Sequence, residues 1–162
     1  MNIRRVLVLM SASALIALSS CGKTAVKPVG MDEDMKFHGE IVQDNVTYSA
    51  DFERAGDAGW KAVFSAPETV EGMEVDLFND TCTVKFNGLS YTAERSELPQ
   101  YGMVALITSA LEDCISGKVK SEKEGSIVTE KGNIQDLDFT VQLKNDKLTA
   151  MDISDVLTAE FK

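Results

Sequence analysis

The chain has 162 residues, of which 44% are hydrophobic and 26% are charged. This length is sufficient for one domain that buries a sizeable core. Acidic residues outnumber basic ones by 26 to 16, which gives a formal net charge of −10. Because so acidic a surface repels phosphate backbones, we expect no nucleic acid partner.

The N-terminal residues have the pattern of an export signal. Arg4 and Arg5 form a basic head, and an apolar run follows over residues 6–18. The run is shorter than the ~20 apolar residues that a membrane-spanning helix needs. A basic head with a short apolar segment is instead typical of a signal peptide. We therefore predict that residues 1–20 are a signal peptide.

The signal ends in Leu18-Ser19-Ser20-Cys21, which resembles the lipobox of bacterial lipoproteins. The resemblance implies that Cys21 receives a diacylglyceryl group, that the chain is cut just before it, and that the new amine is often acylated, as with palmitate. Stable anchoring needs at least two acyl chains, because one gives only marginal membrane binding. The alternatives are a signal-anchor helix, or an ordinary cleaved signal with a chance cysteine.

This prediction places the protein at the cell membrane, lipid-anchored and facing the extracellular side, or in the periplasm or outer membrane of a double-membraned host. The mature chain would keep 14 basic and 26 acidic residues, a net charge of −12. Residues 21–34 would hold the lipidated cysteine and a flexible tether, because they carry Gly, Pro and charges without apolar periodicity. Residues 35–162 would form the folded domain.

Two further cysteines, Cys82 and Cys114, fall within that domain. Disulfides persist in exported proteins, and a bridge between positions so far apart would stabilise the domain by about 3–4 kcal/mol. The alternative is that both are buried free thiols that pack as small hydrophobic groups. The sequence leaves both alternatives open.

Alternation of apolar and polar residues begins at Met35 and predicts six strands in the first part of the domain. In the second of these strands, for example, Tyr48, Ala50 and Phe52 alternate with polar residues. Asn87-Gly88 is the favoured dipeptide of a two-residue hairpin turn. The six expected strands cover residues 35–41, 46–53, 60–64, 73–78, 81–86 and 89–94.

One helix is expected, over residues 102–116, because its apolar residues recur at helical spacing and Gly117 is placed to end it. Three or four strands should follow, over residues 125–130, 137–143, 147–153 and, as a final candidate, 156–161. The expected fold class is mainly β (α+β): a large antiparallel sheet of about 9–10 strands with one main covering helix; the resemblance described next implies that this sheet is a curved half-barrel.

This plan and several short motifs resemble the LolA/LppX-type lipoprotein-carrier fold, and more closely a group of small clostridial-type lipoproteins. The motifs are residues 48–54, Trp60, and residues 64–67, 70–73, 84–91 and 98–99, with the helix that starts at Gly102. The resemblance covers roughly residues 35–118. Beyond it, the Gly-x-Tyr strand and the Thr-Gly-x-Pro turn that are usual in the family are absent.

The resemblance implies an open half-barrel whose apolar concave face carries acyl chains or whole lipoproteins. The side chains expected to line this cavity are Phe37, Phe52, Trp60, Phe64, Phe86 and Leu89. A curved sheet with such residues on one face must cover them with the helix or leave room for a ligand. The alternative is that the helix fills the concavity and leaves no pocket.

The sequence offers few side chains for catalysis or metal binding. His38 is its one histidine and falls on the polar side of a predicted strand; a Ser-His-Asp triad would need it, yet no Gly-x-Ser-x-Gly motif occurs. Zinc sites need several His or Cys ligands, so we expect neither a metal nor a cofactor. Glu112 and Asp113 fit a solvated helix face. We therefore expect that the protein is not an enzyme.

Together these observations predict a membrane-anchored lipoprotein that binds or carries a lipid or another apolar ligand in a half-barrel cavity. The main alternative is a non-catalytic module that presents its acidic outer face to an envelope protein and has a filled core. A subunit of an envelope enzyme is a third, much weaker hypothesis.

Overall fold

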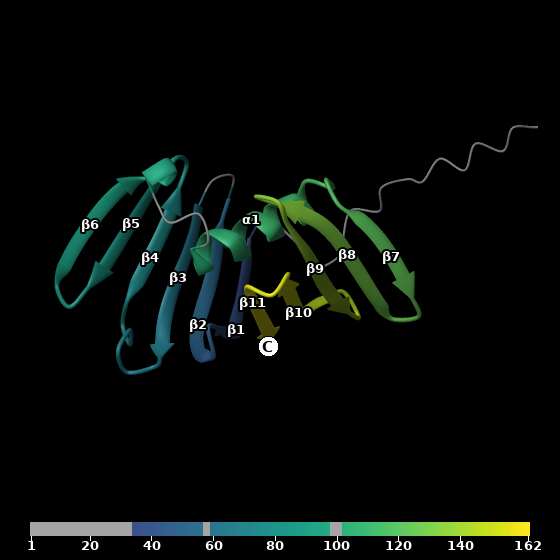
Figure 1. The fold of residues 1–162 in the computed structure, drawn as a ribbon, viewed down its shortest axis with the longest axis horizontal. Coiled ribbons are helices and arrows are strands. Elements are labelled where there is room, and N and C mark those ends of the chain that lie inside the picture. The colour runs from purple at the N-terminus through teal and green to yellow at the C-terminus, as the bar shows by residue number, and fades with distance from the viewer. Residues whose placement is uncertain (1–33, 57–58, 98–101) are drawn as a thin grey trace, which may run out of the picture.

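The structure is a computed structural model and describes residues 34–56, 59–97 and 102–162 (Figure 1). A 3₁₀ turn (Arg95–Glu97) follows the sixth strand, and helix α1 (Met103–Ile115) precedes the seventh. The strands are β1 (Met35–Gln43), β2 (Val46–Ala55), β3 (Gly59–Ala66), β4 (Glu74–Phe78), β5 (Thr81–Phe86), β6 (Leu89–Glu94), β7 (Lys120–Glu124), β8 (Ile127–Ile134), β9 (Leu137–Lys144), β10 (Lys147–Ile153) and β11 (Leu157–Phe161).

All the described strands belong to one antiparallel sheet with the order β6-β5-β4-β3-β2-β1-β11-β10-β9-β8-β7. The sheet consists of two meanders, β1 to β6 and β7 to β11. They are joined where β1 pairs with β11, for example through Ile41 opposite Ala159. The first and last strands of the domain therefore meet in the middle of the sheet, and β6 and β7 are its two edges.

The sheet is strongly curved and does not close, and α1 lies across its concave face (Figure 1). The chain leaves one edge at β6, passes through α1 and returns to the sheet at the other edge in β7. The connection thus crosses the concave face between the two edges, and the helix covers the middle of that face.

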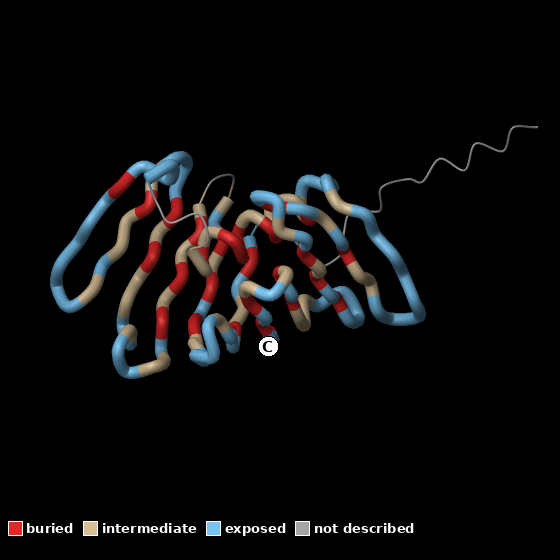
Figure 2. The backbone as a smooth tube through the Cα atoms, viewed as in Figure 1, coloured by how far each residue is buried: buried red, intermediate tan, exposed pale blue. Residues whose placement is uncertain are grey.

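The core lies between α1 and the concave face of the sheet. Strand residues alternate between buried and exposed, because successive side chains point to opposite faces; in β2, Ala50 and Phe52 are buried and Asp51 is exposed. Helix residues such as Leu106 and Leu111 are fully buried against this face. Figure 2 shows that burial is greatest in the middle strands and α1 and declines toward both edges.

Helix α1 ends in a Schellman motif. Gly117 adopts a positive φ of 70°, and its N–H donates to the carbonyl of Cys114 at 3.1 Å. The N–H of Lys118 donates to the carbonyl of Asp113 at 2.9 Å. These two bonds satisfy carbonyls that the helix itself leaves unpaired.

No helix in the described part of the chain is long and apolar enough to cross a membrane.

The predicted fold class is confirmed: the protein is mainly β, with one open curved sheet and one covering helix. The sheet has eleven strands rather than 9–10, because β7 had not been predicted. All five residues of β7 (KSEKE) are exposed, so the strand shows no apolar alternation. Strand β8 also extends further than expected, to Ile134.

Candidate ligand pocket

An apolar pocket of about 320 Å³ opens between the concave face of the sheet and the beginning of α1. This volume lies at the lower end of the range found for small-molecule sites. The lining residues are Tyr48, Phe64, Val70, Met73, Val75, Leu77, Cys82, Gly102, Met103, Val104 and Ala105. None of them carries a charge, so the pocket suits an apolar ligand or the apolar part of an amphipathic one.

The alternation of side chains along the strands determines which residues form the sheet side of the pocket. Leu77 of β4 lies directly opposite Cys82 of β5, and both are buried on the concave face. At the other side, the rings of Tyr48 (β2) and Phe64 (β3) meet edge to face with their centroids 6.2 Å apart. Four neighbouring strands thus supply one continuous apolar wall.

The first turn of α1 and the loop before β4 supply the rest of the lining. Val104 is buried, whereas Met103 and Ala105 are partly exposed at the opening. Val70 and Met73 belong to the turn that connects β3 to β4, where the N–H of Met73 donates to the carbonyl of Val70 at 2.9 Å. The pocket is therefore closed on one side by the helix N-terminus and on another by a hydrogen-bonded turn.

A partly buried polar contact fixes α1 against the sheet. The Arg54 guanidinium, whose side chain is 7% exposed, donates through Nε to Glu112 Oε1 at 2.7 Å and through Nη2 to Oε2 at 3.2 Å. The indole Nε1 of Trp60 also donates to Glu112 Oε1 at 2.7 Å. Residues of β2 and β3 thereby hold one carboxylate of the helix.

The prediction that Glu112 belongs to a solvated face is wrong, because its carboxylate is bound to the sheet. Partial burial opposes ionisation of this carboxyl, but the hydrogen bonds from Arg54 and Trp60 outweigh that effect and hold its pKa below the usual value. Charge-assisted hydrogen bonds of this kind favour the ionised form. Glu112 is therefore a docking group of the helix.

The two cysteines of the domain are free thiols, and both are buried. Of the two alternatives that the sequence left open, the structure has the unbridged one. Burial raises the pKa of Cys82, and burial together with the nearby Glu130 raises that of Cys114 to about 12. Neither thiol is therefore ionised near neutral pH, and Cys82 is a neutral lining group of the pocket.

The six aromatic and aliphatic residues that the sequence assigned to the cavity separate into three groups. Phe64 lines the pocket. Phe37, Phe52 and Trp60 instead form an aromatic cluster, in which Phe37 stacks on Phe52 with centroids 5.2 Å apart and meets Trp60 edge to face. Phe86 and Leu89 lie beyond the pocket, near the β6 edge. The helix thus fills part of the concavity and leaves a pocket at its N-terminal end.

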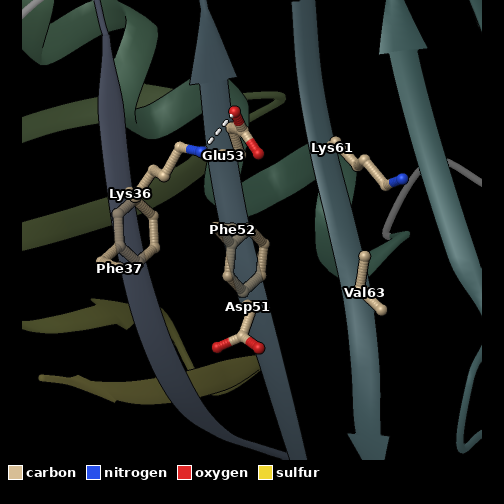
Figure 3. Close-up of a pocket in the computed structure, with 7 residues that line it drawn as sticks. All are labelled: Lys36, Phe37, Asp51, Phe52, Glu53, Lys61 and Val63. Atoms are coloured by element: carbon tan, nitrogen blue, oxygen red, sulfur yellow. Dashed lines mark ion pairs between the residues drawn. The ribbon is translucent and has the colours of Figure 1, made fainter.

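A second hollow, of about 500 Å³, lies over β1, β2 and β3 (Figure 3). It is lined by Lys36, Asp51, Glu53, Lys61 and Val63, which have the strand parity opposite to the buried residues, and by two of the predicted cavity residues, Phe37 and Phe52. An ion pair of 2.8 Å joins Lys36 to Glu53 across its rim, drawn as a dashed line in Figure 3. Because charged side chains form its edge, this hollow on the convex face is a poor site for an apolar ligand.

The same convex face holds a chain of hydrogen bonds of the Ser-His-Asp type that the sequence motifs did not indicate. His38 Nδ1 lies 2.8 Å from Asp51 Oδ1, and Ser49 Oγ lies 2.9 Å from His38 Nε2. The Asp51 side chain is 71% exposed, however, and Glu40 lies directly opposite Ser49 in the strand register. Such a site needs hydrogen-bond donors for the oxyanion of a tetrahedral intermediate, whereas the position opposite Ser49 is held by Glu40, which pairs with Lys162 at 2.8 Å. We therefore regard these bonds as cross-strand contacts between β1 and β2.

Other predicted site residues lie outside the described part of the chain, including Cys21 and the whole tether up to residue 33. Leu98-Pro99 also lies outside it. Within the described residues, no three His, Cys, Asp or Glu side chains gather in a way that would hold a metal ion.

Most of the residues that line the pocket were not predicted from the sequence. Val75 and Leu77 alternate correctly for a strand, and their side of the sheet was recognisable from that pattern. Val70, Met73 and Ala105 carried no such signal, because they come from a turn and from the first helical turn. Only the three-dimensional packing brings these segments together.

Comparison with known proteins finds solved structures of similar fold but no matching family. No protein-family model matches the sequence, and no curated protein matches it. An uncharacterized conserved protein from Thermus thermophilus is similar in structure, with a TM-score of 0.50 and 12% identity over 85% of this chain and 84% of that one. A LolA superfamily protein from Nitrosomonas europaea aligns with a TM-score of 0.42 and 7% identity, over 85% of this chain and 88% of that one. The first similarity shows that this curved sheet with its helix is a fold that recurs in a solved structure.

Proposed function

We propose that the protein is a lipid-anchored carrier or sensor that binds an apolar ligand, such as an acyl chain, in the pocket between α1 and β2 to β5. The observation that carries this proposal is the pocket itself: about 320 Å³ of space lined without a single charged side chain. The uncharged lining is a favourable environment for an apolar ligand. It offers no charged partner to an ionic headgroup.

The energetics favour a ligand with a chain of methylene groups. Each methylene removed from water contributes about 0.8 kcal/mol, and this gain must exceed the cost of immobilising the ligand. Met103 and Ala105 are partly exposed at the opening, so a polar headgroup can remain in water while the chain is buried. An amphipathic molecule with one chain in the pocket therefore fits better than a compact polar metabolite.

Native mass spectrometry of residues 22–162 tests the pocket directly. All described strands, the helix and the core lie within this segment, so it contains the whole folded unit. After export in a lipid-containing bacterial host, we expect a co-purifying mass in the lipid range. Ala105→Trp should reduce its occupancy at least tenfold, because the indole fills the opening of the pocket.

Val63→Trp is the matched control, since it adds the same bulk at the hollow of Figure 3 on the opposite face. It should bind like the unmodified protein. A clean apo mass, unchanged after incubation with mixed lipid extracts, would contradict the proposal. Equal loss of ligand in both variants would show that the pocket is not the binding site.

We also propose that the chain is anchored to the membrane through lipid on Cys21. The support is the lipobox-like Leu18-Ser19-Ser20-Cys21 after a basic head and a short apolar run. Growth of an expressing bacterium with an alkyne-labelled fatty acid should label the full chain and place it in the membrane fraction. Cys21→Ser should remove the label and release the domain. A label retained by the Cys21→Ser chain would argue against this anchor.

A further inference from the structure

The two edges of the sheet differ in a way that the ligand pocket does not explain. Strand β7 has the sequence KSEKE, and all its residues are exposed. Charged residues on an edge strand prevent it from pairing with another chain. Strand β6 has the sequence LSYTAE, with its single charge at the end. One edge is thus protected against pairing and the other is not.

The inner face of β6 is apolar and uncovered. Leu89 is 77% exposed and Tyr91 is 66% exposed, the highest values among the large hydrophobic residues of the described part. Their cross-strand partners are Phe86 and Val84. These four residues, which we call the β6 patch, lie on the same face as buried Ala93; Leu89 and Tyr91 are exposed, and Phe86 and Val84 are partly buried.

The charge distribution makes this edge compatible with a second copy of the same chain. Charged residues make up 26% of the sequence, yet residues 86–93 (FNGLSYTA) contain none. A net charge of −10 opposes the approach of two whole molecules. Two copies of this uncharged strand, however, meet without opposing like charges. A basic partner, by contrast, would have no carboxylate to pair with along these eight residues.

The register of the β5–β6 hairpin allows the strand to pair with itself. Phe86 and Leu89 flank the two-residue turn and form its hydrogen-bonded pair, so the alternation of antiparallel ladders directs the backbone groups of Ser90 and Thr92 outward. With a two-fold axis at Tyr91, Ser90 of each copy pairs with Thr92 of the other. Leu89 then lies opposite Ala93, and Glu94 lies opposite Gly88.

We propose that β6 pairs antiparallel with β6 of a second copy, about a two-fold axis at Tyr91. Apolar side chains of the β6 patch then face each other on the concave side, and no carboxylate opposes another in the strand pair. One pair of edge strands buries a small area, so the dimer should be weak and dependent on concentration. This pairing does not depend on the ligand pocket.

Sedimentation of residues 22–162 over a wide concentration range measures the pairing. We expect a monomer–dimer equilibrium that shifts toward dimer as salt is raised, because salt screens the repulsion between two acidic molecules. Ser90→Pro should weaken dimerisation at least tenfold, since it removes an outward N–H while proline is tolerated on an edge strand. Tyr91→Lys should do the same by placing two ammonium groups at the axis.

Lys123→Pro is the matched control, because it changes the other edge strand and should leave the equilibrium unchanged. A Tyr91→Cys variant should form an intermolecular disulfide under mild oxidation, whereas Lys123→Cys should not. A monomer at every concentration, or cross-linking that is equal at the two edges, would overturn the proposal. Weaker dimerisation at high salt would also overturn it and would indicate a charged interface.

Discussion

Glu112 shows how far the role of one side chain can differ from its appearance in the sequence. It follows an apolar helix stripe and precedes Asp113, so its position predicts a solvated charge. In the structure it accepts hydrogen bonds from Arg54 and Trp60 and holds the helix to the sheet. A sequence identifies which residues carry charge, whereas the partner of a charge depends on residues more than 50 positions away.

Removing this charge should destabilise the domain. Glu112→Gln keeps an acceptor oxygen but loses the charge-assisted bonds, and we expect a loss of about 1–2 kcal/mol in the free energy of unfolding, because the carboxylate is partly exposed and partly screened. Chemical denaturation at neutral pH measures the loss. Asp113→Asn, which alters only a surface ion pair with Lys118, is the control and should change stability by less than about 0.5 kcal/mol.

The Glu112 contact should also depend on pH. Its pKa is lowered in the folded state from a usual value of 4.5, so the stabilisation is fully present above that value and is lost as the pH falls through the lowered pKa. The difference in stability between the unmodified protein and Glu112→Gln should therefore shrink in acid. A difference that stays constant from neutral pH down to about pH 3 would show that the carboxylate charge does not stabilise the fold.

Glu130 of β8 is a buried acidic residue with an opposite effect on stability. It is fully buried, its Oε2 accepts a hydrogen bond from Ser121 Oγ at 2.6 Å, and its Oε1 has no hydrogen-bond partner. An unsatisfied buried oxygen costs about 1–3 kcal/mol. Glu130→Leu should therefore raise the melting temperature, whereas Ser121→Ala, which removes the hydrogen bond to Oε2, should lower it. A lower melting temperature for Glu130→Leu would show that the carboxylate is satisfied in solution.

At the scale of secondary-structure elements, strands with an apolar face were predictable, and β7, which has no apolar residue, was not. In β2 the buried and exposed residues alternate as the sequence predicted, and Asn87-Gly88 forms the expected turn between β5 and β6. Strand β7 was missed because none of its side chains is buried. It is a strand because its backbone pairs with β8. Backbone hydrogen bonds require no alternation of apolar side chains, so the sequence does not reveal them.

Gly132 makes a strand-level contact that tolerates no side chain. It lies directly opposite Phe139, and a Cβ at Gly132 would come within 2.5 Å of the Phe139 ring. Gly132→Ala must therefore displace this buried ring, and we expect a loss of about 1–3 kcal/mol in the free energy of unfolding. Thr129→Ala on the same strand is the control. Equal stability of the two variants would show that the ring moves aside without cost.

At the scale of the whole molecule, the antiparallel sheet and its covering helix were predictable because apolar residues lie on one face of most strands, whereas the curvature was expected only from the resemblance to the LolA/LppX-type fold. The pocket was only partly predictable. Phe64 was named from the strand pattern, but the space beside it exists because α1 is shorter than the sheet is wide, and the sequence does not show where a helix will lie on a sheet. For the same reason Phe37, Phe52 and Trp60 became part of the packed cluster.

The pairing of β1 with β11 should make the whole domain depend on its last residues. Deleting residues 157–162 removes β11, so β1 keeps β2 but loses its partner on the other side, and the backbone pairing between the two meanders is lost. We expect the truncated chain to lose cooperative unfolding, as measured by circular dichroism during heating. An internal deletion that replaces β6 with a flexible linker removes only an edge strand and should leave a cooperative transition at a lower temperature. A cooperative transition in the chain without β11 would contradict this view.

The same central seam has a consequence for how the protein is made. While the chain emerges from a ribosome or passes through a membrane, β1 is the first strand to appear and β11 is the last. The growing chain must therefore keep this edge of β1 unpaired until β11 has been made. Slow synthesis of residues 157–161 would prolong the time in which this unpaired edge of β1 can pair with another chain. Formation of β11 therefore ends the period in which the β1 edge is prone to aggregation.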